Sequence, residues 1–273
     1  MLRCGRFLLP LDRPLVMGVI NVTPDSFSDG GAFLAPHAAI AHARKLAADG
    51  ADLLDIGGES TRPGSAPVPE AEEMARVLPV LEALRELPIP LSVDTRRPGV
   101  MRAAIAAGAS MINDIEALGA EGAIEALAGA DCGVCLMHKK GDPATMQLQP
   151  VYDDVVAEVR EFLAGRAAAA ERGGIARERI VLDPGFGFGK NDGHNFTLLK
   201  RLGTIAELGY PVLAGWSRKS TLGRLTGRDP EGRLAASIAA ALLAAAGGAR
   251  ILRVHDVRET RDVLLVWEAW NNA

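Results

Sequence analysis

The chain has 273 residues, of which 48% are hydrophobic and 23% are charged. This composition is typical of a globular protein with a full core, and it excludes disordered and collagen-like chains. Lys and Arg number 30 against 34 Asp and Glu, so the formal net charge is −4. Because no long block of like charges occurs, we expect no nucleic acid among the partners.

No segment has the length or apolar character of a membrane span. The most continuous apolar stretch, residues 234–249, is rich in alanine and falls short of the ~20 residues that cross a bilayer. Near the N-terminus, Pro10 and Asp12 interrupt any signal-peptide core. We therefore expect no membrane partner and a cytoplasmic location.

The three cysteines, Cys4, Cys132 and Cys135, are odd in number and do not form a disulfide framework. The C-x-x-C spacing of Cys132 and Cys135 leaves a metal or redox site open. However, both lie in or beside an apolar run, residues 133–137, in which positions three apart point to opposite faces of a strand. A second ligand pair is also missing. We interpret both as core thiols.

Eight short apolar runs recur along the chain and alternate with stretches of helical spacing. The runs are Leu15–Ile20, Leu53–Ile56, Ile89–Val93, Ser110–Ile112, Gly133–Met137, Ile180–Leu182, Val212–Ala214 and Ile251–Val254. Strands joined by helical crossovers pair in parallel, and about 34 residues per unit fits a βαβ step. The pattern predicts an α/β fold, a single (β/α)8 TIM barrel that forms one domain over residues 1–273.

Two small domains and a doubly wound sheet are the rival architectures. No Pro-, Ser- or Gly-rich linker divides the chain. The first strand is not followed by G-x-G-x-x-G, and residues 185–190 match neither that fingerprint nor a P-loop.

Polar side chains follow every predicted strand, where the active sites of such barrels lie. Each alone is explained as a helix cap or a turn residue. Together they predict a site for a compact polar ligand, with cations suited to phosphate. The residues after the first strand, 21–31, are expected to form a mobile loop over this site, although they also fit an ordinary βα connection.

These residues resemble the dihydropteroate synthases. The motifs that carry the resemblance are Met17–Gly31, Asp55–Gly64, Ser92–Thr95, Ile112–Asp114, Asp183–Lys190, Ser217–Ser220 and Arg253–Asp256. The resemblance implies an enzyme that joins 6-hydroxymethyl-7,8-dihydropterin pyrophosphate to p-aminobenzoate with Mg²⁺. It also implies a homodimer, to which the apolar side of the last helix, including Val266 and Trp270, would contribute.

The resemblance also implies a role for each matching residue. Catalytic roles fall to Asp29, Arg62, Lys219, Arg253 and His255. The pterin is expected to contact Asp94, Asn113, Ile115, Met137, Asp183, Lys219 and Arg253. The pyrophosphate is expected to contact Asn21, Thr61, Arg62, Arg253 and His255. The p-aminobenzoate pocket is expected to contain Phe27, Thr61, Pro63, Phe188, Lys219 and Ser220. The loop after the second strand, with Thr61, Arg62 and Pro63, is the second mobile loop that the resemblance implies. Asn21 is the expected magnesium ligand.

The sequence departs from the family pattern after His138, where Lys139 and Lys140 add two charges. Two alternatives to the synthase remain. A methyltetrahydrofolate-binding corrinoid methyltransferase domain shares such a pocket but does not need the diphosphate cations. A catalytically silent pterin-binding paralogue would bind the pterin without turnover.

Overall fold

The computed structural model describes residues 1–22, 34–59, 68–141, 146 and 150–273. Eight parallel strands form its central sheet, in the order β8-β7-β6-β5-β4-β3-β10-β9. They are β3 (Leu15–Asn21), β4 (Leu53–Gly57), β5 (Leu91–Asp94), β6 (Met111–Asp114), β7 (Gly133–Met137), β8 (Ile180–Asp183), β9 (Leu213–Ala214) and β10 (Ile251–Val254). The remaining seam is joined where the Leu182 N–H donates to the Pro211 carbonyl at 2.9 Å, so the sheet is a nearly closed barrel and the predicted fold is confirmed.

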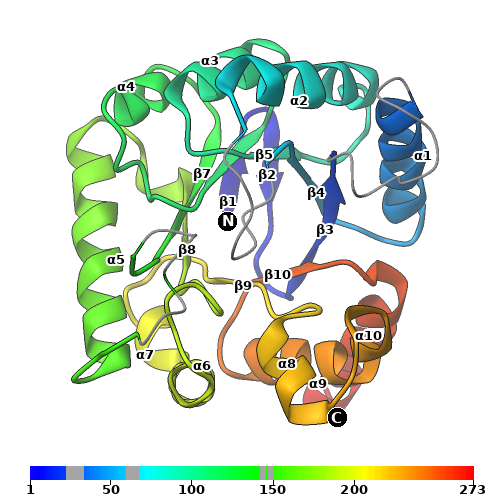
Figure 1. The fold of residues 1–273 in the computed structure, drawn as a ribbon, viewed down its shortest axis with the longest axis vertical. Helices are drawn as coiled ribbons and strands as arrows, with labels where there is room; N and C mark the ends of the chain where they lie inside the picture. The colour runs from blue at the N-terminus through cyan, green and yellow to red at the C-terminus, as the bar shows by residue number, and fades with distance from the viewer. Residues whose placement is uncertain (23–33, 60–67, 142–145, 147–149) are drawn as a thin grey trace.

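Helices surround the strands in Figure 1. They are α1 (Leu34–Ala48), α2 (Glu70–Leu84), α3 (Pro98–Ala106), α4 (Ala123–Ala128), α5 (Val155–Arg172), α6 (Asp192–Lys200), α7 (Gly203–Ala206), α8 (Ser220–Thr226), α9 (Leu234–Ala246) and α10 (Val257–Asn271), with 3-10 turns at Arg177–Arg179 and Pro230–Arg233. Within the described residues, no helix is long and apolar enough to cross a membrane.

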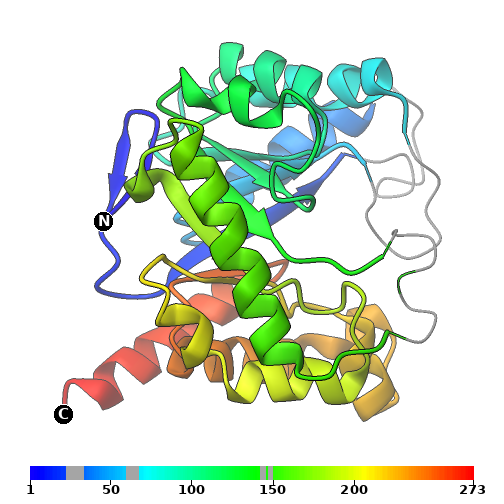
Figure 2. The same ribbon diagram turned by 90° about the vertical axis from the view of Figure 1, so that its left-hand side faces the viewer.

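The barrel interior is apolar at the N-terminal ends of the strands. Met17, Leu53 and Met111 are fully buried there, and Leu2 and Cys4 join them. The latter two come from an antiparallel hairpin, β1 (Leu2–Cys4) and β2 (Phe7–Leu9), which Figure 2 shows in blue at one end of the barrel. Strands of three residues are too short to show a period, so the sequence pattern does not predict this hairpin.

The C-x-x-C cysteines point to opposite sides of the sheet, as predicted: Cys135 lies in β7 and Cys132 directly precedes it. Cys135 belongs to the core inside the barrel, whereas Cys132 belongs to the core between strands and helices. Burial raises the pKa of the Cys132 thiol to about 12 and that of Cys135 well above its usual value. Among the described residues, no group of three His, Cys, Asp or Glu side chains is placed to hold a metal.

Candidate active site

A polar layer lies inside the barrel, directly above the apolar floor. Side chains two apart on a strand face the same side, so the residue two places after each buried floor residue also points inward. In this way Leu53 is followed by Asp55, Met111 by Asn113, Val181 by Asp183, and Ile251 by Arg253. Ser92 and Asp94 of β5 add to the layer through register with β4 and β6.

Arg253 joins two of the three acidic residues of this layer, Asp55 and Asp94. Its Nε lies 2.6 Å from Asp55 Oδ2, and its Nη2 lies 3.0 Å from Asp94 Oδ2. The Asn113 amide also donates to Asp55 Oδ2, at 3.0 Å. The exposed fractions of the side chains are 0% for Asp55, 11% for Asp94 and 23% for Arg253. The guanidinium is therefore fixed by two carboxylates while part of it still faces the barrel mouth.

The charges of this layer are strongly coupled. Burial raises the pKa of Asp94 to about 7, an effect that Arg253 opposes and Asp55 increases. Burial also raises the pKa of Asp183 above its usual value. The Arg253 pKa stays above its ordinary range because Asp55 and Asp94 outweigh the effect of burial. Clustered carboxylates of this kind are typical of a functional site that accepts hydrogen bonds from a ligand.

Three buried oxygens in the layer have no hydrogen-bond partner within the described chain: Asp55 Oδ1, Ser92 Oγ and Asn113 Oδ1. Unpaired buried polar atoms are costly, so such a group points to an absent partner. Because the Asn113 NH₂ donates to Asp55, its oxygen is left to accept. The layer therefore fits a ligand that is rich in N–H donors.

Asp55 is a site residue that the sequence analysis quoted in a motif but gave no role. The signal in the sequence is a carboxylate inside an otherwise apolar strand, Leu53–Gly57. Asp55 is two positions after Leu53, so both side chains point into the barrel. A buried carboxylate in such a strand needs a partner, and here the partners are Asn113 and Arg253.

The segment between β9 and α8 supplies the cationic side of the site. Arg218 has a positive φ of 59°, and its side chain turns back to Asp256 at 2.6 Å. Lys219, the next residue, places its Nζ 4.3 Å from the centre of the Phe188 ring. His255 Nδ1 lies 2.9 Å from the Ser217 hydroxyl. Arg218 is therefore held in a structural ion pair. The strained backbone at this residue turns the chain so that the next cation, Lys219, faces the site.

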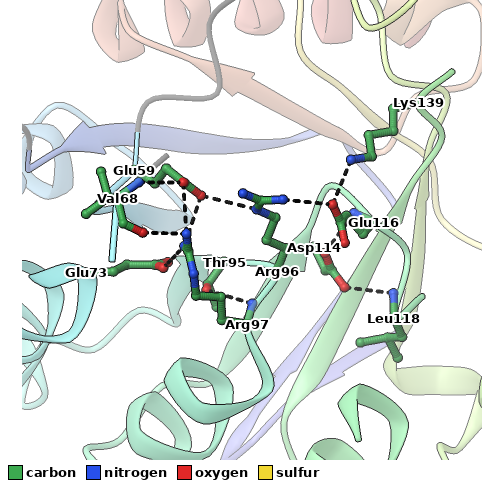
Figure 3. A network of polar contacts seen from close by, with 10 residues as sticks. All are labelled: Glu59, Val68, Glu73, Thr95, Arg96, Arg97, Asp114, Glu116, Leu118 and Lys139. Atoms are coloured by element: carbon green, nitrogen blue, oxygen red, sulfur yellow. Dashed lines mark hydrogen bonds and ion pairs between the residues drawn. The ribbon is translucent and has the colours of Figure 1, made fainter. Parts of the chain in front are cut away.

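A network of charged side chains lies at the C-terminal rim of β4 to β7 (Figure 3). Arg97 makes a two-pronged contact with Glu59, with both N–O distances 3.1 Å. Arg96 joins Glu59 to Glu116, which also accepts from Lys139 at 2.7 Å. The two lysines that depart from the family pattern are therefore paired, since Lys140 contacts Glu158 at 2.9 Å.

His138 directly follows β7 and is a buried neutral imidazole. Its Nδ1 lies 2.9 Å from Lys190 Nζ, and its ring packs edge-on against Phe162. Burial, with a contribution from Lys190, lowers the pKa of His138 to about 3 from an ordinary 6.5. Below pH 6.5 the unfolded chain therefore binds a proton at His138 that the folded chain does not, and acid favours unfolding.

We expect this difference to be measurable with His138→Asn, which keeps an acceptor near Nδ1 but does not titrate. Between pH 7 and pH 5, the unfolding free energy of the wild type should fall by about 2 kcal/mol relative to the variant. Urea denaturation at both pH values measures it. The carboxyl groups are the same in both proteins, so their contribution to the pH dependence cancels in the comparison. Equal pH dependence in the two proteins would contradict a buried neutral imidazole.

The structure brings together most of the described residues that the sequence predicted for the site. Asp94, Asn113, Asp183 and Arg253 lie in the polar layer, and Lys219 contacts Phe188. The remaining described residues lie around it, with Ile115 and Met137 buried, Asn21 and His255 half-buried, and Ser220 exposed at the start of α8. Phe27, Asp29, Thr61, Arg62 and Pro63 lie outside the described residues, as do residues 23–31 and 60–64 of the two predicted mobile loops.

Comparison with known proteins gives concordant matches. The model of the pterin binding enzyme family matches residues 17–255. The dihydropteroate synthase of Neisseria meningitidis serogroup C is 53% identical and covers 98% of this chain and 96% of its own length. The structure of the Xanthomonas albilineans enzyme with 4-aminobenzoic acid has a TM-score of 0.93 at 57% identity, covering 97% of this chain and 96% of the other. That of the Burkholderia cenocepacia enzyme with 7,8-dihydropteroate has a TM-score of 0.91 at 53% identity, covering 99% and 96%.

Proposed function

Because the chain belongs to the dihydropteroate synthases of the pterin-binding enzyme family, we propose how its residues perform that reaction. The enzyme joins 6-hydroxymethyl-7,8-dihydropterin pyrophosphate to p-aminobenzoate and releases 7,8-dihydropteroate and pyrophosphate. The observation that carries the proposal is the layer of buried carboxylates and unpaired oxygens inside the barrel mouth. Its acceptors match the N–H groups of a pterin.

The pterin is recognised by the polar layer. Asp183 accepts the ring N–H and the exocyclic amino group together, as a carboxylate does in bidentate contacts. Asp94 and Asn113 meet the other ring nitrogens, and Lys219 donates on the carbonyl side. Arg253 stacks on the ring plane, and Met137 and Ile115 form apolar walls. Asp55 holds Arg253 and Asn113 in place through the contacts of 2.6 and 3.0 Å.

The diphosphate is bound where cations meet the end of β3. Arg253 of β10 and His255 of the following turn lie beside β3, with which β10 pairs. Arg62 adds a third cationic side chain, and Thr61 adds a hydroxyl. The Asn21 amide oxygen, at the end of β3, is a suitable ligand for Mg²⁺, which takes few protein oxygens and several from substrate phosphates and water. When bound, the ion offsets the negative charge of the departing diphosphate.

The reaction is a largely dissociative displacement. The carbon–oxygen bond to the diphosphate breaks first, and its electron pair leaves with the diphosphate. The electron-rich ring stabilises the pterin methylene cation that remains. The p-aminobenzoate nitrogen then forms the new bond to this carbon and loses a proton. Phe188, Lys219 and Ser220 bind p-aminobenzoate with Phe27, Thr61 and Pro63, and Asp29 acts with the first loop to exclude water from the cation.

Positional isotope exchange tests this order. With ¹⁸O in the oxygen that bridges carbon and diphosphate, we expect label to move to non-bridging positions in the presence of magnesium and the absence of p-aminobenzoate. Chelation of magnesium should stop the exchange. Turnover without any exchange at every p-aminobenzoate concentration would show that the amine attacks before the bond breaks.

We also propose that the enzyme is cytoplasmic and that residues 1–273 form one domain. Two copies of this domain are proposed to associate as a homodimer. Helix α10 packs on α9 and β3, yet Leu265, Val266 and Trp270 of α10 and Leu243 of α9 remain exposed. Exposed large apolar side chains on two helices that pack against each other support association of two copies through these helices. A monomeric mass by light scattering would contradict the dimer.

A further inference from the structure

The loop from Gly185 to Gly189, after β8, packs directly on the residues that follow β7. Gly185, Gly187 and Gly189 have φ values of +67°, +81° and +63°. A Cβ at Gly185 would lie 1.9 Å from the His138 carbonyl oxygen, and one at Gly189 would lie 2.2 Å from that of Lys140. Only glycine allows both the positive φ and this close approach. The alternating glycines turn the backbone so that its carbonyl groups point inward.

Lys190 lies where these carbonyl groups converge. Its Nζ contacts His138 Nδ1 and the Gly185 carbonyl, both at 2.9 Å, and the Phe188 carbonyl at 3.1 Å. All three ammonium protons therefore have a partner. The side chain is fully buried, and the three acceptors are neutral groups. When Lys190 is protonated, His138 accepts through Nδ1 and carries its own proton on Nε2.

Burying an ammonium group against neutral partners is expensive. Burial lowers the pKa of Lys190 to about 7, although the charge of Asp183 opposes this shift. Where a buried side chain only has to fill space, an apolar side chain does so at a lower cost in folding free energy. The chain retains a cation here, and groups that violate the ordinary rules of burial are typically tied to function.

A second buried side chain holds the same loop from the other side. The Asn195 carbonyl oxygen accepts from the Gly187 N–H at 2.8 Å, and its NH₂ donates to the Asn191 carbonyl at 2.9 Å. Asn195 is fully buried at the start of α6. Lys190 therefore fixes the carbonyl groups of the loop while Asn195 fixes an N–H.

The loop touches two residues assigned to the pterin. The Gly185 N–H donates to Asp183 Oδ1 at 2.7 Å, and the Phe188 ring lies against Lys219. From these contacts we propose that Lys190 is a positioning residue, whose ammonium group holds the glycine loop so that Asp183 and Lys219 face the pterin correctly. This inference rests on the proposed roles of Asp183 and Lys219.

The structure offers a matched control at the opposite end of β8. Arg179 precedes Ile180, the first residue of the strand, and is 5% exposed. Its guanidinium donates to the carbonyl groups of Cys132 and Leu127, both at 2.7 Å. Like Lys190, it is a buried cation that binds backbone oxygens near β7. Unlike Lys190, it lies at the closed end of the barrel, away from the polar layer.

The test compares Lys190→Met with Arg179→Met. We expect both to lower the melting temperature. Only Lys190→Met should also lower kcat/KM, by on the order of 10²-fold, because small displacements of substrate-binding groups have effects of this size. Its Kd for 6-hydroxymethyl-7,8-dihydropterin, measured by calorimetry without diphosphate or magnesium, should rise at least about tenfold. Lys190→Gln, which retains two N–H donors, should recover part of the loss.

The outcomes separate the two proposals. If the wild type neither binds this pterin nor turns over, the proposed function fails. If the wild type is active and Lys190→Met keeps wild-type kcat/KM and Kd, Lys190 is a structural cation only and the inference is overturned. Should Lys190→Met fail to fold, Lys190→Gln decides: reduced pterin affinity supports the inference, whereas wild-type affinity overturns it.

Discussion

Asp183→Asn should lower kcat/KM about 10³-fold and leave the folded protein at least as stable as the wild type. Asparagine cannot accept two N–H donors of the pterin in the bidentate manner of a carboxylate, and lost hydrogen bonds to a charged group cost about 1.5–3 kcal/mol each. In the free enzyme, however, the carboxylate is a burden, since burial raises its pKa. Steady-state kinetics and urea denaturation measure the two effects.

Asp52→Asn is the matched control and should show the reverse pattern. Asp52 precedes β4 at the closed end of the barrel, where it accepts from the Val16 N–H at 2.8 Å and from Arg261 at 2.7 Å. Burial raises its pKa, but the Arg13 ion pair at 2.7 Å together with Val16 and Arg261 outweighs burial, so the pKa of Asp52 is lowered. Its loss should reduce the unfolding free energy by roughly 1–3 kcal/mol and leave kcat/KM unchanged. Near-normal turnover by Asp183→Asn would remove Asp183 from pterin recognition.

Arg253→Met should impair both activity and stability. The guanidinium neutralises Asp55 and Asp94 at 2.6 and 3.0 Å, and removal of one partner from a buried ion pair costs about 3–5 kcal/mol. Removing a cation that stabilises the departing diphosphate should lower kcat by about 10²-fold or more. Arg253→Lys keeps the charge but loses the planar fork, so it should recover stability better than activity.

Arg261→Met controls for the loss of an arginine near a carboxylate. Arg261 contacts Asp52 at 2.7 Å and is 18% exposed, but it lies at the closed end of the barrel. We expect a smaller loss of stability, on the order of 1 kcal/mol, and unchanged kinetics. If Arg253→Met retained wild-type kcat, the guanidinium would have no part in the reaction beyond folding.

The strands were predictable because buried parallel strands leave continuous apolar runs between helices. All eight predicted runs correspond to barrel strands, and β7 and β10 begin and end where predicted. The structure extends β3 to Asn21, β5 to Asp94 and β8 to Asp183. These polar residues therefore end the strands instead of following them, which places their side chains at the barrel mouth.

Other features depend on contacts that a sequence pattern does not contain. The role of Asp55 follows from Arg253, which lies 198 positions away in the chain. Likewise, the carbonyl groups around Lys190 converge only after the loop has folded onto the residue after β7. The sequence marks such residues as polar and buried, but only the three-dimensional arrangement names their partners.

A turnover assay tests the central claim most directly. Purified protein is incubated with 6-hydroxymethyl-7,8-dihydropterin pyrophosphate, labelled p-aminobenzoate and magnesium, and both products are followed together. We predict equal amounts of labelled 7,8-dihydropteroate and pyrophosphate, with formation of both abolished by chelation. Binding of the pterin compound without formation of either product would contradict the account and identify the chain as a silent pterin-binding paralogue.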